Sequence, residues 1–337
     1  MAIIRCNKCA HLQEQADSEI GVTLACPRCD HPTQVYPTIF FVTRLLEKYF
    51  TAQREVIRLT TAATAGAAGA AGAAPPAKPA DSAGPPAGVD LSNTDRMTSN
   101  EQHQPIADWF RRKQVSVQIA AGAVDTSGFF DEVATLIGRN LPLLKEVLDR
   151  IRWAQQKGYA STVIPFDGKS PADVQSLTSF CRQLYEYSFV AKTVPNKQKN
   201  HLLLVVQTAP AIRHFFNGEW LEWFALMSCM EQATARGKQF SCARKLGLTL
   251  ADGEQLEVDV FLLLDGGLPI LIECKSGEYR QDIDKYVGLR KRLGLSGTNL
   301  ILCVAGLEDE IAKGLTAMYD LSFVSERGLL QHLGRLV

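Results

Sequence analysis

Apolar and polar positions in the C-terminal part of the chain follow an alternating order of helical and extended segments. Helical periodicity is found at residues 216–235, 279–293 and 307–318. Apolar runs of strand length occur at residues 257–264, 269–274, 299–304 and 321–324. Helices and strands in this order pack as an α/β sandwich, so we predict an α/β domain over residues 210–337.

The preceding segment, residues 105–209, predicts helices followed by a β-hairpin. An apolar stripe at 143–153 indicates one helix, and Ser170-Pro171 supplies the cap and first-turn proline of a second. Two extended runs then flank a polar turn at 195–200. This order is typical of a winged helix and equally of a helical spacer with a stabilising hairpin. On or near the wing lie Lys192, Lys197 and Lys199.

Composition divides the N-terminal part into three segments. Residues 1–36 carry two cysteine pairs, and residues 37–60 place aromatic residues and leucines at helical spacing, which predicts an amphipathic helix. Residues 61–104 are rich in alanine, glycine and proline and then polar, as in a flexible linker. We therefore expect a multidomain α/β protein.

The bulk composition is that of an ordinary globular protein, with 46% hydrophobic and 21% charged residues. Lys and Arg balance Asp and Glu at 36 each, so net charge does not indicate a partner. We expect no secretory signal before Cys6 and no membrane span, since no apolar run reaches about 20 residues. The nine cysteines, two CxxC pairs and five singles, indicate a reducing cytoplasm.

The two CxxC pairs predict a structural zinc ribbon over residues 1–36. Sixteen residues separate Cys6-x-x-Cys9 from Cys26-x-x-Cys29, and four thiolates complete tetrahedral Zn²⁺ coordination. Redox-active dithiols are the alternative, but the βαβ context of that motif is missing from the sequence. A closed site excludes catalysis at this metal, and zinc supplies the folding energy of so small a core. Its partner is either DNA or another protein.

The candidate catalytic residues flank a hairpin turn at 265–267. With a three-residue loop, Asp259 lies opposite Glu273 on the neighbouring strand; a two-residue loop shifts the partner by one position. Glu273 and Lys275 are two residues apart and project to the same face of their strand. All three side chains are therefore expected at one place.

Phosphodiester hydrolysis explains why these residue types are needed. Asp259 and Glu273, with the Cys274 carbonyl, offer hard oxygen ligands to Mg²⁺ or Mn²⁺, and Lys275 orients and helps deprotonate a water or stabilises the phosphate. Carboxylates within apolar strands are unfavourable unless paired or metal-bound. The alternative is structural: a surface salt bridge between Glu273 and Lys275, with Asp259 paired to an arginine.

Asp259, thirteen residues, Glu273-Cys274-Lys275 and a following helix together resemble the PD-(D/E)xK nuclease superfamily. The blocks at 216–222 (FNGEWLE) and 274–277 (CKSG) are more similar to one branch, the nuclease half of CRISPR ancillary effectors activated by cyclic oligoadenylate. The resemblance covers about residues 213–325, and Val258 stands where the motif has proline.

The resemblance implies a restriction-endonuclease-like fold, a further metal-site glutamate on the first helix and a role in defence. The matching glutamate is Glu222, with Glu219 as the fallback. Many enzymes of the superfamily dimerise to cut both strands, and the sequence leaves a homodimer open. The part before residue 210 lacks a Rossmann-like nucleotide-sensing pattern, so activation by cyclic oligoadenylate is not carried over.

The leading hypothesis is a cytoplasmic, Mg²⁺- or Mn²⁺-dependent endonuclease acting on nucleic acid, with DNA favoured. Its zinc ribbon and winged-helix-like region would position substrate or a protein partner. The alternative is a non-catalytic DNA-binding or adaptor protein that uses those two modules. A nuclease that is silent until a ligand or partner arrives is a third hypothesis.

Overall fold

The computed structural model describes residues 2–38 without Asn7 and Ala10, Val42, residues 100–119, and residues 129–337 without Lys197 and Lys199. Apart from its first two residues and Val42, the helix expected at 37–60 lies outside the described residues, as do the linker up to residue 99 and two of the candidate wing lysines. The chain forms two compact units, Met1–Ala83 and Gly84–Val337. None of the described helices is long and apolar enough to cross a membrane.

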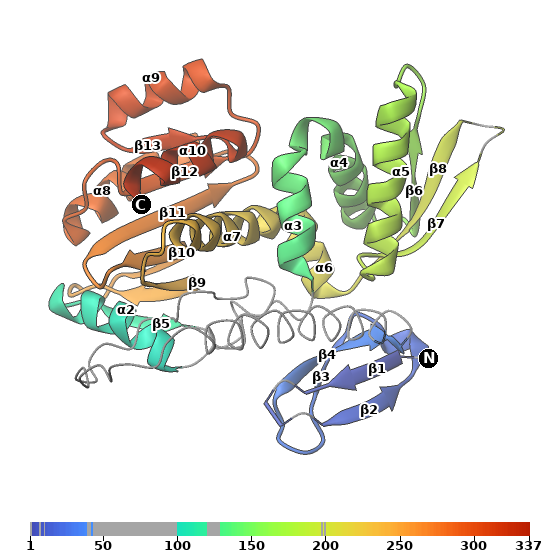
Figure 1. Cartoon of the computed structure of the whole chain (residues 1–337), viewed down its shortest axis with the longest axis horizontal. Helices are drawn as coiled ribbons and strands as arrows, with labels where there is room; N and C mark the ends of the chain where they lie inside the picture. Colours follow the sequence, from blue (N-terminus) through green and yellow to red (C-terminus); the bar gives the residue numbers. More distant parts are fainter. Residues whose placement is uncertain are drawn as a thin grey trace, which may run out of the picture. The chain divides into compact units, whose positions relative to one another are not determined.

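The first unit holds a four-stranded antiparallel sheet with the order β2-β1-β4-β3 (Figure 1). Its elements are β1 (Ala2–Arg5), β2 (Leu12–Gln15), the 3-10 turn η1 (Asp17–Glu19), β3 (Thr23–Ala25) and β4 (Pro32–Pro37). Its buried apolar cluster consists of Ala2, Ile4 and Val35. A core this small provides little hydrophobic stabilisation, so the unit needs another source of folding energy.

A six-stranded sheet with the order β13-β12-β11-β10-β9-β5 forms the centre of the second unit. The strands are β5 (Ser116–Ile119), β9 (Phe240–Thr249), β10 (Gln255–Leu264), β11 (Leu268–Lys275), β12 (Leu300–Val304) and β13 (Ser322–Val324). β11, β12 and β13 are parallel, whereas β11, β10, β9 and β5 pair antiparallel. The central strands are apolar on both faces because helices cover both sides.

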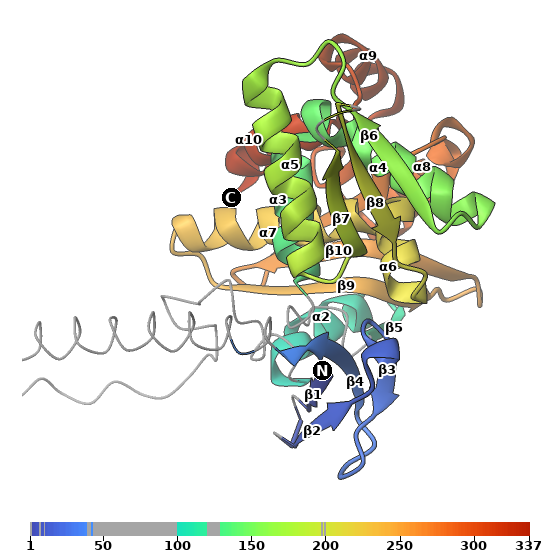
Figure 2. The ribbon, with the colours of Figure 1, turned by 90° about the vertical axis from the view of Figure 1, so that its right-hand side faces the viewer.

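Helices cover the two faces of this sheet (Figures 1 and 2). α7 (Trp220–Ala235) contacts β9, β10 and β11, and α10 (Glu326–Leu336) packs beside it. On the other face one apolar cluster joins the sheet to α2 (Asn100–Arg112), α8 (Ile283–Leu293) and α9 (Asp309–Tyr319). The short turn η4 (Arg280–Asp282) leads into α8. The predicted α/β packing is present, with β9 and α10 as additions that periodicity did not reveal.

The placement of α2 and β5 corrects the sequence-based division of the chain. The sequence assigned residues 105–119 to the middle domain, and the linker was expected to run to residue 104. In the structure α2 begins at Asn100, the Phe110 ring lies 4.8 Å from that of Phe261 on β10, and β5 pairs with β9. These segments complete the C-terminal sheet. Pairing between segments so distant in sequence leaves no trace in local periodicity.

The middle region combines three helices with a small antiparallel sheet of order β6-β8-β7. Its elements are α3 (Phe130–Arg139), α4 (Leu141–Lys157), β6 (Ser161–Pro165), α5 (Pro171–Glu186), β7 (Val190–Asn196) and β8 (His201–Val206). Ser170 Oγ accepts a 3.1 Å hydrogen bond from the Asp173 amide, which is the predicted cap. The predicted hairpin is β7–β8, and β6 extends it to three strands.

Close packing of α3 against α7 joins the middle region to the C-terminal sheet. A Cβ at Gly138 of α3 would lie 2.3 Å from the Phe224 ring, so only glycine allows this approach. Nearby, the ring of Phe130 stacks on Trp223 with centroids 6.1 Å apart. The middle region is thus part of the same compact unit as α7.

Candidate active site and four-cysteine centre

The backbone before α7 brings the start of that helix against the end of β11. α6 (Pro210–His214) leads into a π-helical segment, η3 (Phe215–Glu219), in which Gly218 has a φ of 139°. A Cβ at Gly218 would lie 2.6 Å from Ser276 Oγ. Glycine is required here because both the backbone angle and the free space exclude a side chain. Single π-helical turns of this kind occur frequently at functional sites.

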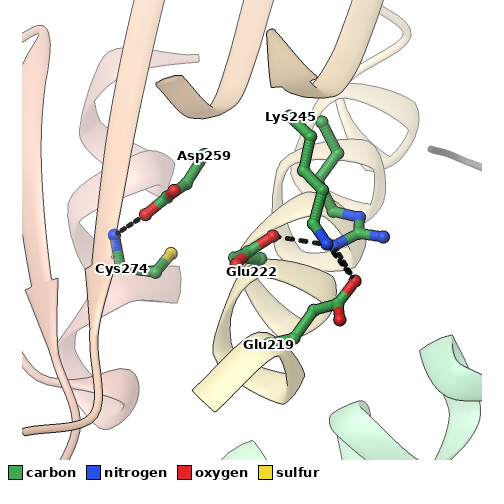
Figure 3. Close-up of polar contacts among 6 residues, drawn as sticks. Glu219, Glu222, Lys245, Asp259 and Cys274 are labelled. Atoms are coloured by element: carbon green, nitrogen blue, oxygen red, sulfur yellow. Dashed lines mark hydrogen bonds and ion pairs between the residues drawn. The ribbon is translucent and has the colours of Figure 1, made fainter. Parts of the chain in front are cut away.

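Asp259 lies where the pairing of β10 with β11 stops. The paired residues run from Leu264–Leu268 to Val260–Ile272, which is the predicted register with a three-residue loop. One position further, Asp259 Oδ2 accepts a 2.7 Å hydrogen bond from the Cys274 amide (Figure 3). The carboxylate therefore replaces a backbone carbonyl as the partner of this amide.

Glu273 is a buried carboxylate with incomplete hydrogen bonding. Its side chain is 2% exposed, and Oε1 has no hydrogen-bond partner. Burial and the nearby charge of Asp259 raise its pKa well above the usual value, although the Tyr286 hydroxyl of α8 donates a hydrogen bond to it. Such a group is destabilising in its charged form unless a cation approaches.

Lys275 projects toward α8, on the same side as Glu273. Its Nζ lies 3.0 Å from Asp282 Oδ2 and 5.6 Å from the ring centroid of Tyr286. Burial lowers the pKa of Lys275, but the ion pair with Asp282 outweighs this effect and the net shift is upward. The surface salt bridge between Glu273 and Lys275 considered above is wrong, because Glu273 is buried and the lysine pairs elsewhere.

Glu222 reaches this region from α7. Burial and repulsion from Asp259 raise its pKa to about 7, against the attraction of Arg244. Arg244 Nη1 lies 2.7 Å from Glu222 Oε2 and 2.8 Å from Glu219 Oε1, and Lys245 Nζ lies 2.6 Å from the same Glu219 oxygen (Figure 3). The two helix glutamates are thus held by a basic pair.

Arg244 and Lys245 are residues of the candidate site that the sequence analysis missed. Neighbours in a regular strand point to opposite faces, yet both side chains contact Glu219. The cause is Lys245, whose φ of 55° interrupts β9 and turns both side chains toward α7. The Arg244 guanidinium also lies 4.2 Å above the ring of Trp223. The sequence feature that could have revealed them is a pair of adjacent basic residues within an apolar run.

Asp259 is the carboxylate whose charge acts on both of the others. Its repulsion contributes to the raised pKa of Glu222 and of Glu273, and burial raises its own pKa. Among the described residues, these three do not form a group whose potential ligand atoms all lie within 4.8 Å of one another. The arrangement concentrates negative charge in a poorly solvated place, and a divalent cation would relieve it.

The four cysteines of the first unit do form such a group. The Sγ atoms of Cys6, Cys9, Cys26 and Cys29 all lie within 4.8 Å of one another. The Cys26 carbonyl accepts hydrogen bonds from the amides of Cys29 and Asp30, and the Arg28 amide donates to Cys26 Sγ at 3.4 Å. This turn brings the thiols of Cys26 and Cys29 close to those of Cys6 and Cys9. The predicted four-cysteine site is confirmed as a group that could hold a metal such as zinc.

Comparison with known proteins gives structural neighbours only. No protein-family model matches the chain, and no curated protein matches it in sequence. Two similar solved structures are protein VC1899 from Vibrio cholerae (16% identity) and Can2 from Sulfobacillus thermosulfidooxidans in complex with cyclic tetra-adenylate (17% identity). Each alignment covers 68% of this chain and 60% of the other, with a TM-score of 0.46.

Proposed function

We propose that the chain is an Mg²⁺- or Mn²⁺-dependent endonuclease whose centre is formed by Asp259, Glu273 and Lys275. The observation that carries this proposal is the Glu273 carboxylate, which is buried, lacks a partner for Oε1 and is repelled by Asp259. An unpaired buried charge is strongly destabilising, and natural proteins retain one mainly where it binds something. A divalent cation is the partner that its chemistry fits.

The available donors suit a hard cation. Asp259 and Glu273 supply carboxylate oxygens and Cys274 a backbone carbonyl, and Mg²⁺ and Mn²⁺ bind oxygen ligands. When bound, the metal would lower the pKa of a water and neutralise charge on the phosphate. Glu222 would complete the acidic set from α7, with Arg244 fixing one of its oxygens and leaving the other available.

Lys275 would act as a fixed positive charge. Its ion pair with Asp282 holds the side chain in place and favours the protonated form. A lysine that remains charged is suited to orienting the attacking water and stabilising the developing charge on the phosphate, and less suited to removing a proton. Positioning of this kind requires the charge and the geometry together.

Nucleic acid is the proposed substrate, with DNA favoured. The four-cysteine ribbon and the winged-helix-like middle region, which carries Lys192 on β7, would position the substrate or a protein partner. The motif resemblance to CRISPR effectors supports a role in defence against foreign nucleic acid. The proposed location is the cytoplasm, because two CxxC pairs and five single cysteines are typical of a reducing compartment.

The test is cleavage of plasmid DNA in Mg²⁺ or Mn²⁺ by the full chain and by Asp259→Asn and Lys275→Ala. Each substitution should reduce the cleavage rate by about 10²–10³-fold. Lys313→Ala is the matched lysine control, because Lys313 is an exposed residue of α9. Equal rates for all four proteins would remove these residues from the mechanism.

Absence of cleavage by the wild type would have two meanings that a second assay separates. DNA binding without cleavage in either metal, also after addition of cyclic oligoadenylates, favours the non-catalytic adaptor. Cleavage that begins only after an activator is added identifies a regulated nuclease.

A further inference from the structure

A polar cavity of about 420 Å³ lies between α4 and the segment that leads into α7. Its lining includes Arg152, Gln155 and Gln156 of α4 and Arg213, His214 and Asn217 of α6 and η3. No acidic side chain lines it. A cavity with cations and neutral hydrogen-bond donors, but no carboxylate, is suited to an anionic ligand.

The cations of this cavity differ in how far other residues neutralise them. Arg213 and His214 are exposed, and among the described residues neither has an ion-pair partner. Arg152 Nη2 lies 2.9 Å from Oδ1 of Asp149 on its own helix. Arg213 is therefore the principal free positive charge, and its guanidinium can engage two oxygens of one phosphate.

The wall on the α4 side is fixed before any ligand arrives. Gln155 is buried, and its Nε2 donates a 2.9 Å hydrogen bond to the Gln207 carbonyl at the end of the hairpin. Trp153 of α4 and Tyr159, two residues beyond the end of that helix, are half-exposed with ring centroids 5.0 Å apart, and neither lines this cavity. Exposed rings are the kind of surface on which unpaired bases stack.

One hydrogen bond joins the lining of the cavity to the residue that follows β11 of the candidate active site. Ser276 Oγ donates to the Asn217 carbonyl at 3.5 Å, and Ser276 directly follows Lys275 on the chain. Two residues beyond Asn217, Glu219 begins the network with Arg244. A chain of phosphates that passed the carboxylates could therefore continue into the cavity.

We propose that this cavity binds the phosphodiester backbone of a nucleic-acid strand next to the phosphate that is cut. The inference rests on the proposed function only in taking nucleic acid as the ligand. Arg213 contacts a backbone phosphate, His214 and Asn217 add hydrogen bonds, and the Trp153–Tyr159 pair supports a base. The cavity thus selects for a strand that extends beyond the cleavage site.

The test is equilibrium binding of labelled 20-nucleotide single strands and duplexes of DNA and RNA to the full chain, in buffer without Mg²⁺ or Mn²⁺. Arg213→Glu should raise the Kd about tenfold, and Arg213→Ala should raise it less and reduce the salt-dependence slope by about 1. Arg335→Glu is the matched control, because Arg335 is exposed at the end of α10 and makes no ion pair among the described residues.

The outcomes separate this inference from the nuclease proposal. An equal Kd for Arg213→Glu and Arg335→Glu, or no binding by the wild type, overturns the cavity assignment. Binding that depends on Arg213 with no cleavage in either metal, also after addition of cyclic oligoadenylates, overturns the nuclease proposal and leaves the cavity assignment standing. A wild-type circular dichroism spectrum for both charge reversals shows that folding is retained.

Discussion

The Asp259 carboxylate accepts a 2.7 Å hydrogen bond from the amide of Cys274, the residue between Glu273 and Lys275. This bond links the strand that carries the aspartate to the strand that carries the other two candidate residues, at the position where regular pairing ends. It also keeps one Asp259 oxygen in a defined direction. The proposed metal site therefore depends on β10 and β11 ceasing to pair at Asp259.

We expect the metal-free protein to lose stability as the pH rises, because its site carboxylates have raised pKa values. The folded state therefore binds these protons more tightly than the unfolded state does. The resulting stabilisation is complete below the pKa of the unfolded state and is lost as the pH rises through the pKa of the folded state. For Glu222, with a pKa of about 7 against 4.5, this amounts to about 3 kcal/mol between those two values. Urea denaturation at pH 5 and pH 8 measures the difference in the free energy of unfolding between the two pH values.

Glu273→Gln should reduce the loss of folding stability at high pH, because the amide has the shape of the carboxyl group and no charge to bury. At pH 8 without metal the variant should be more stable than the wild type, and Mn²⁺ should stabilise the wild type more than the variant. The thermal midpoint of each protein with and without Mn²⁺ measures both effects. A variant that is less stable than the wild type at pH 8 would show that Glu273 is satisfied in the folded protein.

Arg244→Met should destabilise the protein by about 3 kcal/mol, because it leaves two partly buried glutamates without their shared cation. Adding Glu222→Gln to that variant should restore part of the loss, since one uncompensated charge is removed. Lys245→Met should cost less, because the Lys245 side chain is more exposed and, among the described residues, forms an ion pair with Glu219 alone. Free energies of unfolding for the wild type, Arg244→Met, Glu222→Gln and the double variant give the coupling between the two residues; purely additive effects would contradict it.

Gly218→Ala should lower the cleavage rate by a larger factor than its loss of folding stability explains. The added methyl group would lie 2.6 Å from Ser276 Oγ, and alanine is strained at a φ of 139°, so α7 must shift relative to β11. Gly266→Ala is the control, because that glycine also has a positive φ but has nothing within 4 Å of the added carbon. Parallel measurements of cleavage rate and unfolding free energy should separate the two variants; similar losses of activity would argue against a positioning role.

Removal of the four-cysteine metal should unfold the first unit, because its small apolar core cannot replace the metal. We expect one Zn²⁺ per chain by elemental analysis, and none for Cys26→Ser. Limited proteolysis should then cut within residues 2–38 of the variant and spare the same region of the wild type. Resistance of the Cys26→Ser protein would show that the strands fold without metal.

Local sequence signals were sufficient for part of the site. The cysteine spacing predicted the four-cysteine group, and the short turn at 265–267 predicted the register of β10 and β11. Both features join residues near one another along the chain, where turn length and strand alternation leave few arrangements.

The tertiary structure alone decided which partners complete the site. Arg244 reaches Glu222 because Lys245 adopts a left-handed backbone, Asp282 takes the Lys275 ammonium, and β5 joins β9 from more than a hundred residues away. No periodic pattern encodes these contacts. They arise when helices and strands that are separately amphipathic bury their apolar faces together, and that packing sets the surroundings of each charge.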